Sequence, residues 1–345
     1  MRRLYFDPVT DITGAKNRSN ETPYDVPYSR GRIELRHFPA TVKKKQRRQA
    51  PLLLVPPLAG NIKLFDVHPQ YSAVRVLQQA GFEQYLLSWG NPTAADRHNS
   101  IAFYLDEVAK AVTLIKQQTG AKKVALVGYC LGGILAAFYA SRHNDVQCLA
   151  VLNSPFNFAN KRLADHIEKA FYDVPKLLSF GLISRKHFPV RNTSGKFTTV
   201  MYQLSNPAAA LKGRIALYRG CLNKQETEVR LSMQEALNMT NYPGQAMQDM
   251  IDCALSDLIA EQAMMVNGKA IDLTTIKVPI FCAGGLADAT VPRSALLSSL
   301  AIFPKEQITT YEAKGGHIGA VFGMGSVHST WGTVADWITA LEKRH

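Results

Sequence analysis

Short apolar runs recur along the first half of the chain, separated by longer segments of mixed character. Residues 52–55 (LLLV) form one such run, and residues 85–87, 124–127 and 148–152 form three more. Short uninterrupted apolar runs bounded by turn residues are typical of strands that are buried on both faces of a parallel sheet. We therefore expect these segments to be central strands of one sheet.

The segments between these runs have the periodicity of helices. Between residues 101 and 115, apolar side chains recur at spacings of four, three, four and three, which places them on one helix face before Gly120 ends the pattern. Residues 71–80 and 131–141 are also expected to be helical. Strands that alternate with helices in this way predict a mostly parallel, doubly wound α/β sheet.

The alternation stops after residue 155 and resumes near residue 278. New strands are expected at 278–282 and 308–311, and a helix from about residue 329 to 343. We interpret the mixed, mainly helical segment between them as a cap inserted into one sheet. The predicted organisation is an N-terminal extension with an early edge strand near Ile33 and Leu35 (1–50), a first part of the α/β core (51–156), the cap insertion (157–270) and a second part of the core (271–345).

The composition supports a folded α/β protein. Apolar residues make up 46% of the 345 residues and charged residues 19%, too few for a disordered chain. The five cysteines are scattered and none forms a C-x-x-C pair, so we expect neither a zinc site nor a disulfide framework, but free thiols in a reducing cytoplasm. No apolar stretch of about 18 residues predicts a membrane span, and residues 1–8 lack the apolar region of a secretory signal.

The net charge of +13 is partly concentrated in residues 43–48. This basic segment has two interpretations. It can be a solvated loop, or it can contact an anionic partner such as a phosphate-bearing substrate or a lipid surface. No recognisable nucleic-acid-binding motif accompanies the charge, so nucleic acid is not an expected partner.

Residues 128–133 (GYCLGG) join a predicted buried strand to a predicted helix. This is the setting in which G-x-S-x-G forms a sharp turn that presents a nucleophile, and here Cys130 stands in the serine's position. The first helical N–H, that of Leu131, can stabilise an oxyanion, and a second donor is expected after the first buried strand, from Leu58 or Ala59. The alternative is that Cys130 is an ordinary small apolar residue.

A nucleophile of this kind needs a base and an orienting acid, in the chain order nucleophile, acid, histidine. Asp288 follows the strand predicted at 278–282, and His317 follows the strand predicted at 308–311. We expect both to join Cys130 in a catalytic triad. An ordinary turn aspartate and an ordinary loop histidine are the alternatives. The nearest rival histidine, His328, is too close to the final helix.

Five segments together resemble the polyhydroxyalkanoate synthases, which have the α/β-hydrolase fold. They are residues 51–57 (PLLLVPP), 88–92 (SWGNP), 128–133 (GYCLGG), 287–292 (ADATVP) and 315–319 (GGHIG), and the likeness covers residues 50–345 in order.

In that family a cysteine takes an acyl group from a hydroxyacyl-CoA as a thioester, a histidine is its base, and an aspartate assists activation of the substrate hydroxyl. The resemblance implies these roles for Cys130, His317 and Asp288. It implies no cofactor besides the hydroxyacyl-CoA substrate.

The resemblance also suggests partners, and this sequence differs from the family pattern at two places. The short chain is similar to members that work with a second synthase subunit, and a homodimer and a polyester granule surface are further candidate partners, with a cytoplasmic, granule-associated location. Residues 235–240 (EALNMT) lack the tryptophan and aspartate that the family often carries in its cap, and Thr93 replaces an aspartate. These changes fall on the cap and its surroundings rather than on the triad.

Three functions therefore stay open. The first is an acyltransferase that builds a polyester from hydroxyacyl-CoA. The second is a related cysteine enzyme that forms a small ester or hydrolyses a thioester, which the changed cap motivates. The third is a non-catalytic, granule-associated subunit, which the basic segment motivates.

Overall fold

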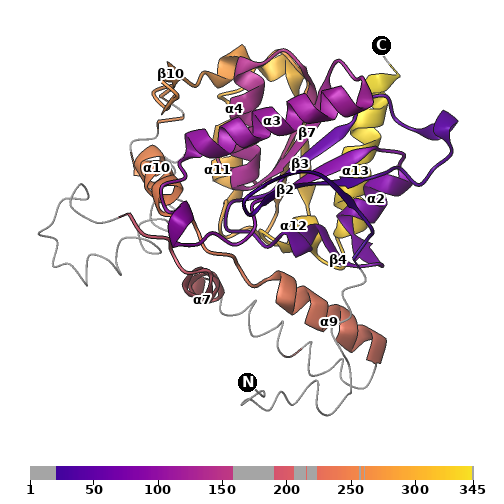
Figure 1. The fold of residues 1–345 in the computed structure, drawn as a ribbon, viewed down its shortest axis with the longest axis horizontal. Helices are drawn as coiled ribbons and strands as arrows, with labels where there is room; N and C mark the ends of the chain where they lie inside the picture. Colours follow the sequence, from indigo (N-terminus) through magenta and orange to yellow (C-terminus); the bar gives the residue numbers. More distant parts are fainter. Residues whose placement is uncertain are drawn as a thin grey trace, which may run out of the picture.

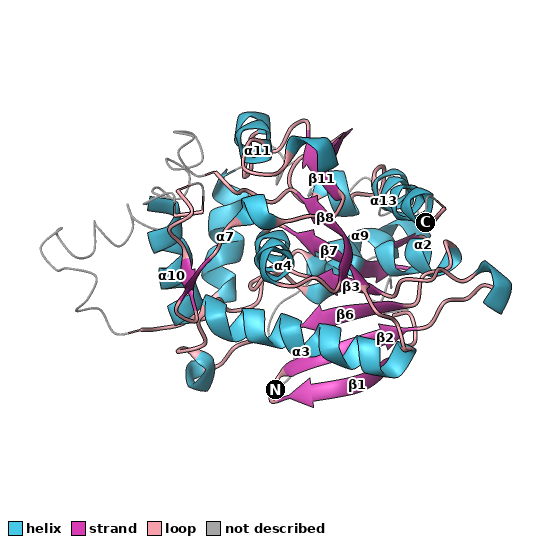
Figure 2. Ribbon diagram, turned by 90° about the horizontal axis from the view of Figure 1, so that it is seen from above, coloured by secondary structure: helices cyan, strands magenta, loops and turns pink. Residues whose placement is uncertain are grey.

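A central eight-stranded sheet organises the protein, seen in a computed structural model that describes residues 21–157, 190–205, 215, 224–255, 258–259 and 261–343. The strand order is β1-β2-β6-β3-β7-β8-β11-β12 (Figure 2). β2 is antiparallel to both neighbours, and every pair from β6 onward is parallel. The strands are β1 (Asp25–Arg30), β2 (Ile33–Phe38), β3 (Leu52–Val55), β6 (Gln84–Ser88), β7 (Val124–Tyr129), β8 (Val146–Leu152), β11 (Ile280–Gly285) and β12 (Ile308–Ala313). The predicted mostly parallel α/β sheet is confirmed.

Helices cover both faces of this sheet (Figure 2). One face carries α3 (Ile101–Thr119), α4 (Leu131–Arg142) and α11 (Arg293–Leu300); the other carries α2 (Ala73–Gln79), α13 (Val327–Glu342) and the short α12 (Gly319–Phe322). Side chains of β3 alternate between the two cores, with Leu53 and Val55 in the first and Leu52 and Leu54 in the second. Because both faces of β3 are buried, all four of its positions are apolar, which explains the uninterrupted run there.

The sheet differs from the sequence prediction mainly at its edge and at the end of β11. The strand near Ile33 exists as β2, but the edge of the sheet is β1, which the pattern did not indicate because its side chains are mostly exposed and Pro27 interrupts it. The pairing of β1 with β2 is irregular between Asp25 and Tyr28. β11 extends to Gly285, where the glycines suggested a loop, because it continues to pair with β12.

A buried carboxylate attaches this irregular edge to the body. The Glu107 side chain on α3 is fully buried and accepts hydrogen bonds from the Tyr28 hydroxyl at 2.9 Å, from Arg30 at 2.6 Å and from Lys110 at 2.8 Å. Burial alone would raise the pKa of Glu107, but the hydrogen bonds from Lys110, Arg30 and Tyr28 outweigh it and lower that pKa. The carboxylate therefore stays ionised and holds β1 against α3.

Between β8 and β11 the chain leaves the sheet and returns to the position next to β8. The described parts of this segment form α7 (Gly195–Ser205), α9 (Lys224–Ala236), α10 (Gly244–Leu255) and the small hairpin β9 (Met265–Val266) and β10 (Lys269–Ala270). Figure 1 shows these helices along the lower and left margins of the body. Residues 158–189, 206–214, 216–223, 256–257 and 260 of the expected cap, and residues 1–20 of the expected extension, lie outside the described residues.

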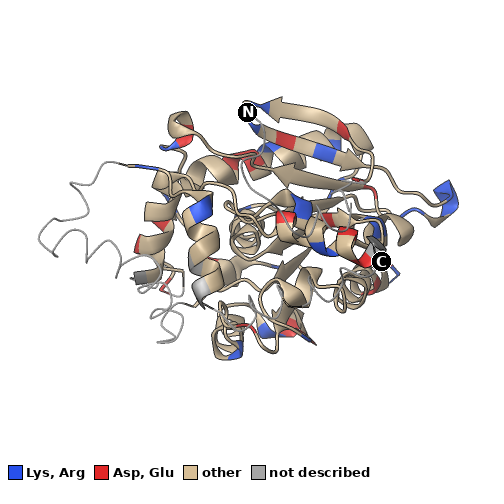
Figure 3. Ribbon diagram, turned by 90° about the horizontal axis from the view of Figure 1, so that it is seen from below, with Lys and Arg blue, Asp and Glu red and all other residues tan. Residues whose placement is uncertain are grey.

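The basic segment projects from the body just before β3. Its short 3-10 helix, Lys44–Gln46, carries the lysines that stand out at the right of Figure 3. Arg48 donates to the carbonyl of Ala80 at 2.8 Å, which fixes one end of the segment. The segment precedes the amino end of β3, so it lies away from the carboxyl ends of the strands.

A second small ladder, β4 (Asp66–His68) with β5 (Tyr71–Ser72), precedes α2. Within the described residues, none of the helices combines the length and apolar character required to cross a bilayer.

Close packing of α4 against β3 gives a first prediction. A Cβ added to Gly132 would collide with the carbonyl oxygens of Val55 and Pro56. We expect Gly132→Ala to lower the free energy of unfolding by about 1–3 kcal/mol, because overpacking is destabilising. Urea unfolding followed by circular dichroism measures the change.

Gly332→Ala is the matched control, because Gly332 also lies in a helix and nothing stands within 4 Å of its added Cβ. It should be neutral or stabilising, since alanine is the better helix former. Equal effects of the two substitutions would contradict the packing argument.

Candidate active site

Cys130 occupies the turn between β7 and α4 with an unusual backbone conformation. Its φ is 53° and its ψ is −123°, a region that residues with a side chain rarely adopt. The turn is held because the Cys130 N–H donates to the carbonyl of Leu152 at 2.8 Å. A Cβ at Gly128 would collide with the backbone of Gly133, so the turn needs glycine there. The half-buried Cys130 thiol therefore stands at the carboxyl end of the sheet, as predicted.

His317 and Asp288 form a buried pair at the same edge of the sheet. Nδ1 of His317 lies 2.8 Å from Oδ2 of Asp288. The other carboxylate oxygen, Oδ1, accepts the backbone N–H groups of Thr290 and Val291, both at 2.8 Å. The Asp288 side chain is fully buried and the His317 side chain is 7% exposed. Because both carboxylate oxygens have partners, Asp288 has a fixed orientation toward the imidazole.

The pKa of His317 reflects its two neighbours. Burial of the ring lowers this pKa, but the charges of Asp288 and Cys130 and the hydrogen bonds to both raise it more, to about 10. Since Nδ1 faces Asp288, the remaining ring nitrogen, Nε2, is the one available to the thiol. The structure therefore brings together the three residues that the sequence singled out. His328 lies apart from them on α13, where its Nε2 contacts the carbonyl of Gln70 at 2.7 Å.

A cavity of about 270 Å³ opens over Cys130 and His317. Apolar side chains dominate the lining of this cavity, and the α/β core and the segment between β8 and β11 contribute them in equal measure. They include Leu58, Leu131, Ile134, Met239, Met247 and Met250. Met247 and Met250 lie on one face of α10, and methionine side chains adapt to irregular shapes. Such a lining suits an acyl chain better than a polar substrate.

The expected oxyanion donors lie beside the thiol. Leu131 is the first residue of α4, so its N–H is among those without an acceptor in a preceding helical turn. Leu58 follows β3, is 1% exposed and lines the same cavity. Ala59, the alternative, also lines the cavity, and its carbonyl accepts the N–H of Thr240 at 3.0 Å. Their role as oxyanion donors stays a prediction.

The two departures from the synthase pattern lie in different places. Of residues 235–240, Ala236, Leu237 and Met239 line the cavity, so this change alters the wall of the site. Thr93 instead caps a short helical turn, where its N–H and hydroxyl both bond Asp96. Only the first departure faces the space in which a substrate would bind.

Two residues that the sequence pattern did not indicate contact His317. The hydroxyl of Tyr129 and the amide of Asn153 both donate to the backbone carbonyl of His317, at 3.2 Å and 2.6 Å. Tyr129 directly precedes Cys130, and Asn153 is the first residue after β8. Their positions at the carboxyl ends of parallel strands are a signal that could have indicated them, because sites in such sheets form there.

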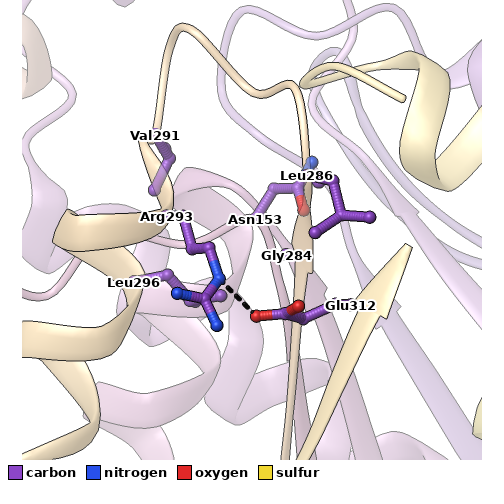
Figure 4. A pocket seen from close by; sticks show the side chains of 8 residues that line it. Asn153, Gly284, Leu286, Val291, Arg293, Leu296 and Glu312 are labelled. Atoms are coloured by element: carbon purple, nitrogen blue, oxygen red, sulfur yellow. Dashed lines mark hydrogen bonds and ion pairs between the residues drawn. The ribbon is translucent and has the colours of Figure 1, made fainter. Parts of the chain in front are cut away.

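A small hollow lies beneath the loop that carries Asp288 (Figure 4). Val291, Leu296 and Asn153 line this hollow, together with the ion pair between Nε of Arg293 and Oε1 of Glu312 at 2.5 Å. The pair joins the start of α11 to β12. Both side chains are largely exposed, at 55% and 40%, so the pair contributes at most about 1 kcal/mol to stability.

The remaining cysteines differ from Cys130. Cys148, Cys253 and Cys282 are buried. Burial raises the pKa of the Cys282 thiol to about 12 and that of Cys148 still further, so neither is a nucleophile near neutral pH. Cys221 lies outside the described residues. The described part of the chain contains no group of three or more potential ligands able to hold a metal ion.

The turn at Cys130 and the order of the sheet define an α/β hydrolase. A family model for the alpha/beta hydrolase fold matches residues 50–321, and the chain belongs to this family. A crystal structure of the monoacylglycerol lipase of Paleococcus ferrophilus has the same fold, with a TM-score of 0.52 and 16% identity, over 90% of this chain and 99% of that one.

Within that family, the chain is similar in sequence to poly(3-hydroxyalkanoate) polymerases over most of its length. It is similar to the poly(3-hydroxyalkanoate) polymerase subunit PhaC of Haloferax mediterranei, with 25% identity over 92% of this chain and 64% of the relative. It is also similar to the subunit of that name in Allochromatium vinosum, with 22% identity over 86% of this chain and 83% of the relative. The chain therefore spans less than two thirds of the Haloferax protein.

The His317–Asp288 pair gives a second prediction. Asp288→Asn removes the carboxylate charge, so we expect the pKa of His317 to fall well below about 10. The unfolded value is about 6.5. In the unmodified protein the raised pKa adds stability that is fully present below about pH 6.5 and is lost as the pH rises through about 10.

NMR titration of the His317 imidazole measures the shift, and urea unfolding between pH 6.5 and pH 10 measures the linked stability. The variant should show a flatter dependence of stability on pH over this range. An unchanged histidine titration in Asp288→Asn would show that the carboxylate does not control the imidazole.

Proposed function

We propose that this chain is an acyltransferase of the polyhydroxyalkanoate-synthase type. Its Cys130 thiol would take an acyl group from a hydroxyacyl-CoA and pass it to a hydroxyl group, which extends a polyester. The observation that carries the proposal is the convergence of Cys130, His317 and Asp288 under an apolar cavity. The similarity to the PhaC subunits of Haloferax mediterranei and Allochromatium vinosum supports it.

The first half-reaction would form a thioester on Cys130. The thiol proton passes to Nε2 of His317, and Asp288 stabilises the resulting imidazolium, in line with the raised pKa of that histidine. The sulfur then bonds to the substrate's carbonyl carbon, and the backbone N–H groups of Leu131 and Leu58 would stabilise the oxyanion. When the intermediate collapses, the bond to the CoA sulfur breaks, and that sulfur leaves with the proton from His317.

The second half-reaction would transfer the acyl group to an alcohol. A hydroxyl oxygen bonds to the thioester carbon while His317 takes its proton, and the bond to Cys130 breaks with return of the proton to sulfur. Both oxygens of Asp288 already have partners in Thr290, Val291 and His317. Asp288 therefore would assist the hydroxyl through His317 rather than by direct contact.

The apolar cavity also bears on the second candidate, a thioesterase or small-ester transferase. An apolar lining disfavours water as the acceptor of the acyl group. The changed wall at residues 235–240 is the specific observation that keeps this candidate open. We further propose that residues 157–270 act as a cap over the site and that the protein works in the cytoplasm, beside a polyester granule, with a second subunit or a second copy of the chain.

Formation of the acyl enzyme is the central test. On incubation with 3-hydroxybutyryl-CoA, we expect release of CoA and an increase in intact mass by one hydroxybutyryl group. Cys130→Ala should abolish both, because no other described cysteine combines cavity access with a reactive thiol. Cys282→Ala is the matched control and should retain the adduct. If neither an adduct nor CoA release occurs with any partner or primer, the proposal fails.

The size of the product separates the candidate functions. A polyester synthase should yield high-molecular-mass material by size-exclusion chromatography, with CoA released in proportion to the units joined. Monomeric 3-hydroxybutyrate as the sole product would identify a thioesterase instead. An inert Cys130 together with binding to polyester granules would identify the non-catalytic subunit.

A further inference from the structure

The end of β8 connects the loops on either side of it. The carbonyl of Leu152, the last residue of β8, accepts the N–H of Cys130 at 2.8 Å. The next residue, Asn153, donates its own N–H to the carbonyl of Ala283 in β11, also at 2.8 Å. β11 leads directly into the loop of Asp288. The backbone of Asn153 is therefore fixed between the two strands that precede the candidate nucleophile and the candidate acid.

The side chain of Asn153 then reaches the third loop. Its Nδ2 donates to the carbonyl of His317 at 2.6 Å, and the Tyr129 hydroxyl donates to the same oxygen at 3.2 Å. Asn153 is 1% exposed and Tyr129 is 3% exposed, so water does not compete with these donors. Burial raises the pKa of Tyr129 well above its ordinary value, so its hydroxyl keeps its proton across the usual assay range. The ring centres of Tyr129 and His317 are 5.3 Å apart.

The backbone around His317 does not restrict its own conformation. Gly315 and Gly316 precede the histidine, Gly319 follows closely, and Gly315 has a φ of 119° that glycine adopts readily. A loop of this composition needs partners from outside to hold one conformation. Backbone N–H groups of Ala287 and Ala320 hold the carbonyls of Gly315 and Gly316, at 2.9 Å and 2.8 Å. The two buried side-chain donors add the restraint at the carbonyl of His317 itself.

We propose that Asn153 and Tyr129 are positioning residues that hold the His317 carbonyl and thereby align its imidazole between Asp288 and Cys130. The inference rests on the proposed function, in which His317 moves the proton of Cys130. Neither residue needs to contact the acyl group. Asn153 also suits its place because its φ of 48° lies in the left-handed region, which asparagine tolerates better than most residues.

Two substitutions of Asn153 separate the hydrogen bond from the backbone conformation. Asn153→Gly keeps the left-handed conformation but removes the donor. We expect the rate of Cys130 acylation to fall about tenfold to a hundredfold, because a small misplacement of a catalytic group has an effect of this size. Asn153→Asp keeps the shape but sets a carboxylate oxygen against the carbonyl oxygen of His317. When this new carboxyl group is protonated, it can donate a hydrogen bond to that carbonyl again. The rate of Cys130 acylation in Asn153→Asp, relative to that in Asn153→Gly, should therefore rise as the pH falls.

Tyr129→Phe tests the second donor. We expect the rate of Cys130 acylation to fall less than in Asn153→Gly, because the hydrogen bond of Tyr129 is longer and the ring remains in place. In the double variant that combines Asn153→Gly with Tyr129→Phe, the acylation rate should fall by more than the product of the two single fold-changes. Either donor alone still restrains the same carbonyl in the single variants. Strict additivity would contradict a shared function of the two side chains.

Asn267→Gly is the matched control, because Asn267 also has a positive φ, of 52°, but is exposed on the hairpin of β9 and β10. It should acylate at the rate of the unmodified protein. If Asn153→Gly does the same, or loses only the rate that its unfolded fraction explains, the positioning role is wrong.

A measurement without substrate distinguishes this inference from the proposed function. NMR titration should show a lower pKa for His317 in Asn153→Gly than the value near 10 of the unmodified protein, because contacts with Asp288 and Cys130 loosen. An unchanged histidine titration would overturn the positioning role. Failure of the unmodified protein to acylate, with the titration shifted as expected, would instead overturn the proposed function alone.

Discussion

The close approach of α4 to the ends of β3 and β7 is the constraint on which the site depends. The helix can begin directly after Cys130 because Gly128 and Gly132 have no side chains that would collide with neighbouring backbone. The same approach requires a positive φ at Cys130 and directs its side chain away from the strand, into the cavity. By contrast, the thiol of Cys148 lies within strand β8 and is buried in the sheet.

Burial then determines how the polar groups of the site behave. His317 and Asp288 are almost fully removed from water, and a buried charge is tolerated only where its hydrogen-bonding capacity is satisfied. Asp288 meets this requirement with two backbone N–H groups and the imidazole. His317 is held from two sides, by Asp288 at its ring and by side-chain donors at its carbonyl. The rigidity of the pair therefore comes from residues on four different strand ends.

The surroundings of the thiol are mainly apolar. The cavity takes its apolar wall partly from the α/β core and partly from α9 and α10, so the segment between β8 and β11 shapes the space next to Cys130. The basic segment lies near the amino ends of the strands, on a projecting loop, and cannot contact an acyl group at Cys130 (Figure 3). A contact of that segment with an anionic surface would therefore be separate from the chemistry.

The sequence by itself predicted most of the sheet, the turn at Cys130, and the placement of Asp288 and His317 at the same edge of the sheet. These follow from local patterns and from chain order, because the carboxyl ends of parallel strands meet at one edge. It did not indicate β1, whose exposed, proline-containing segment carries no apolar pattern and is held by Glu107 from a distant helix. Only the tertiary structure identified Tyr129 and Asn153 as partners of His317, since 188 and 164 residues separate them in the chain. The lining of the cavity was likewise decided by packing, because side chains from core and inserted segment meet there without any signal in their spacing.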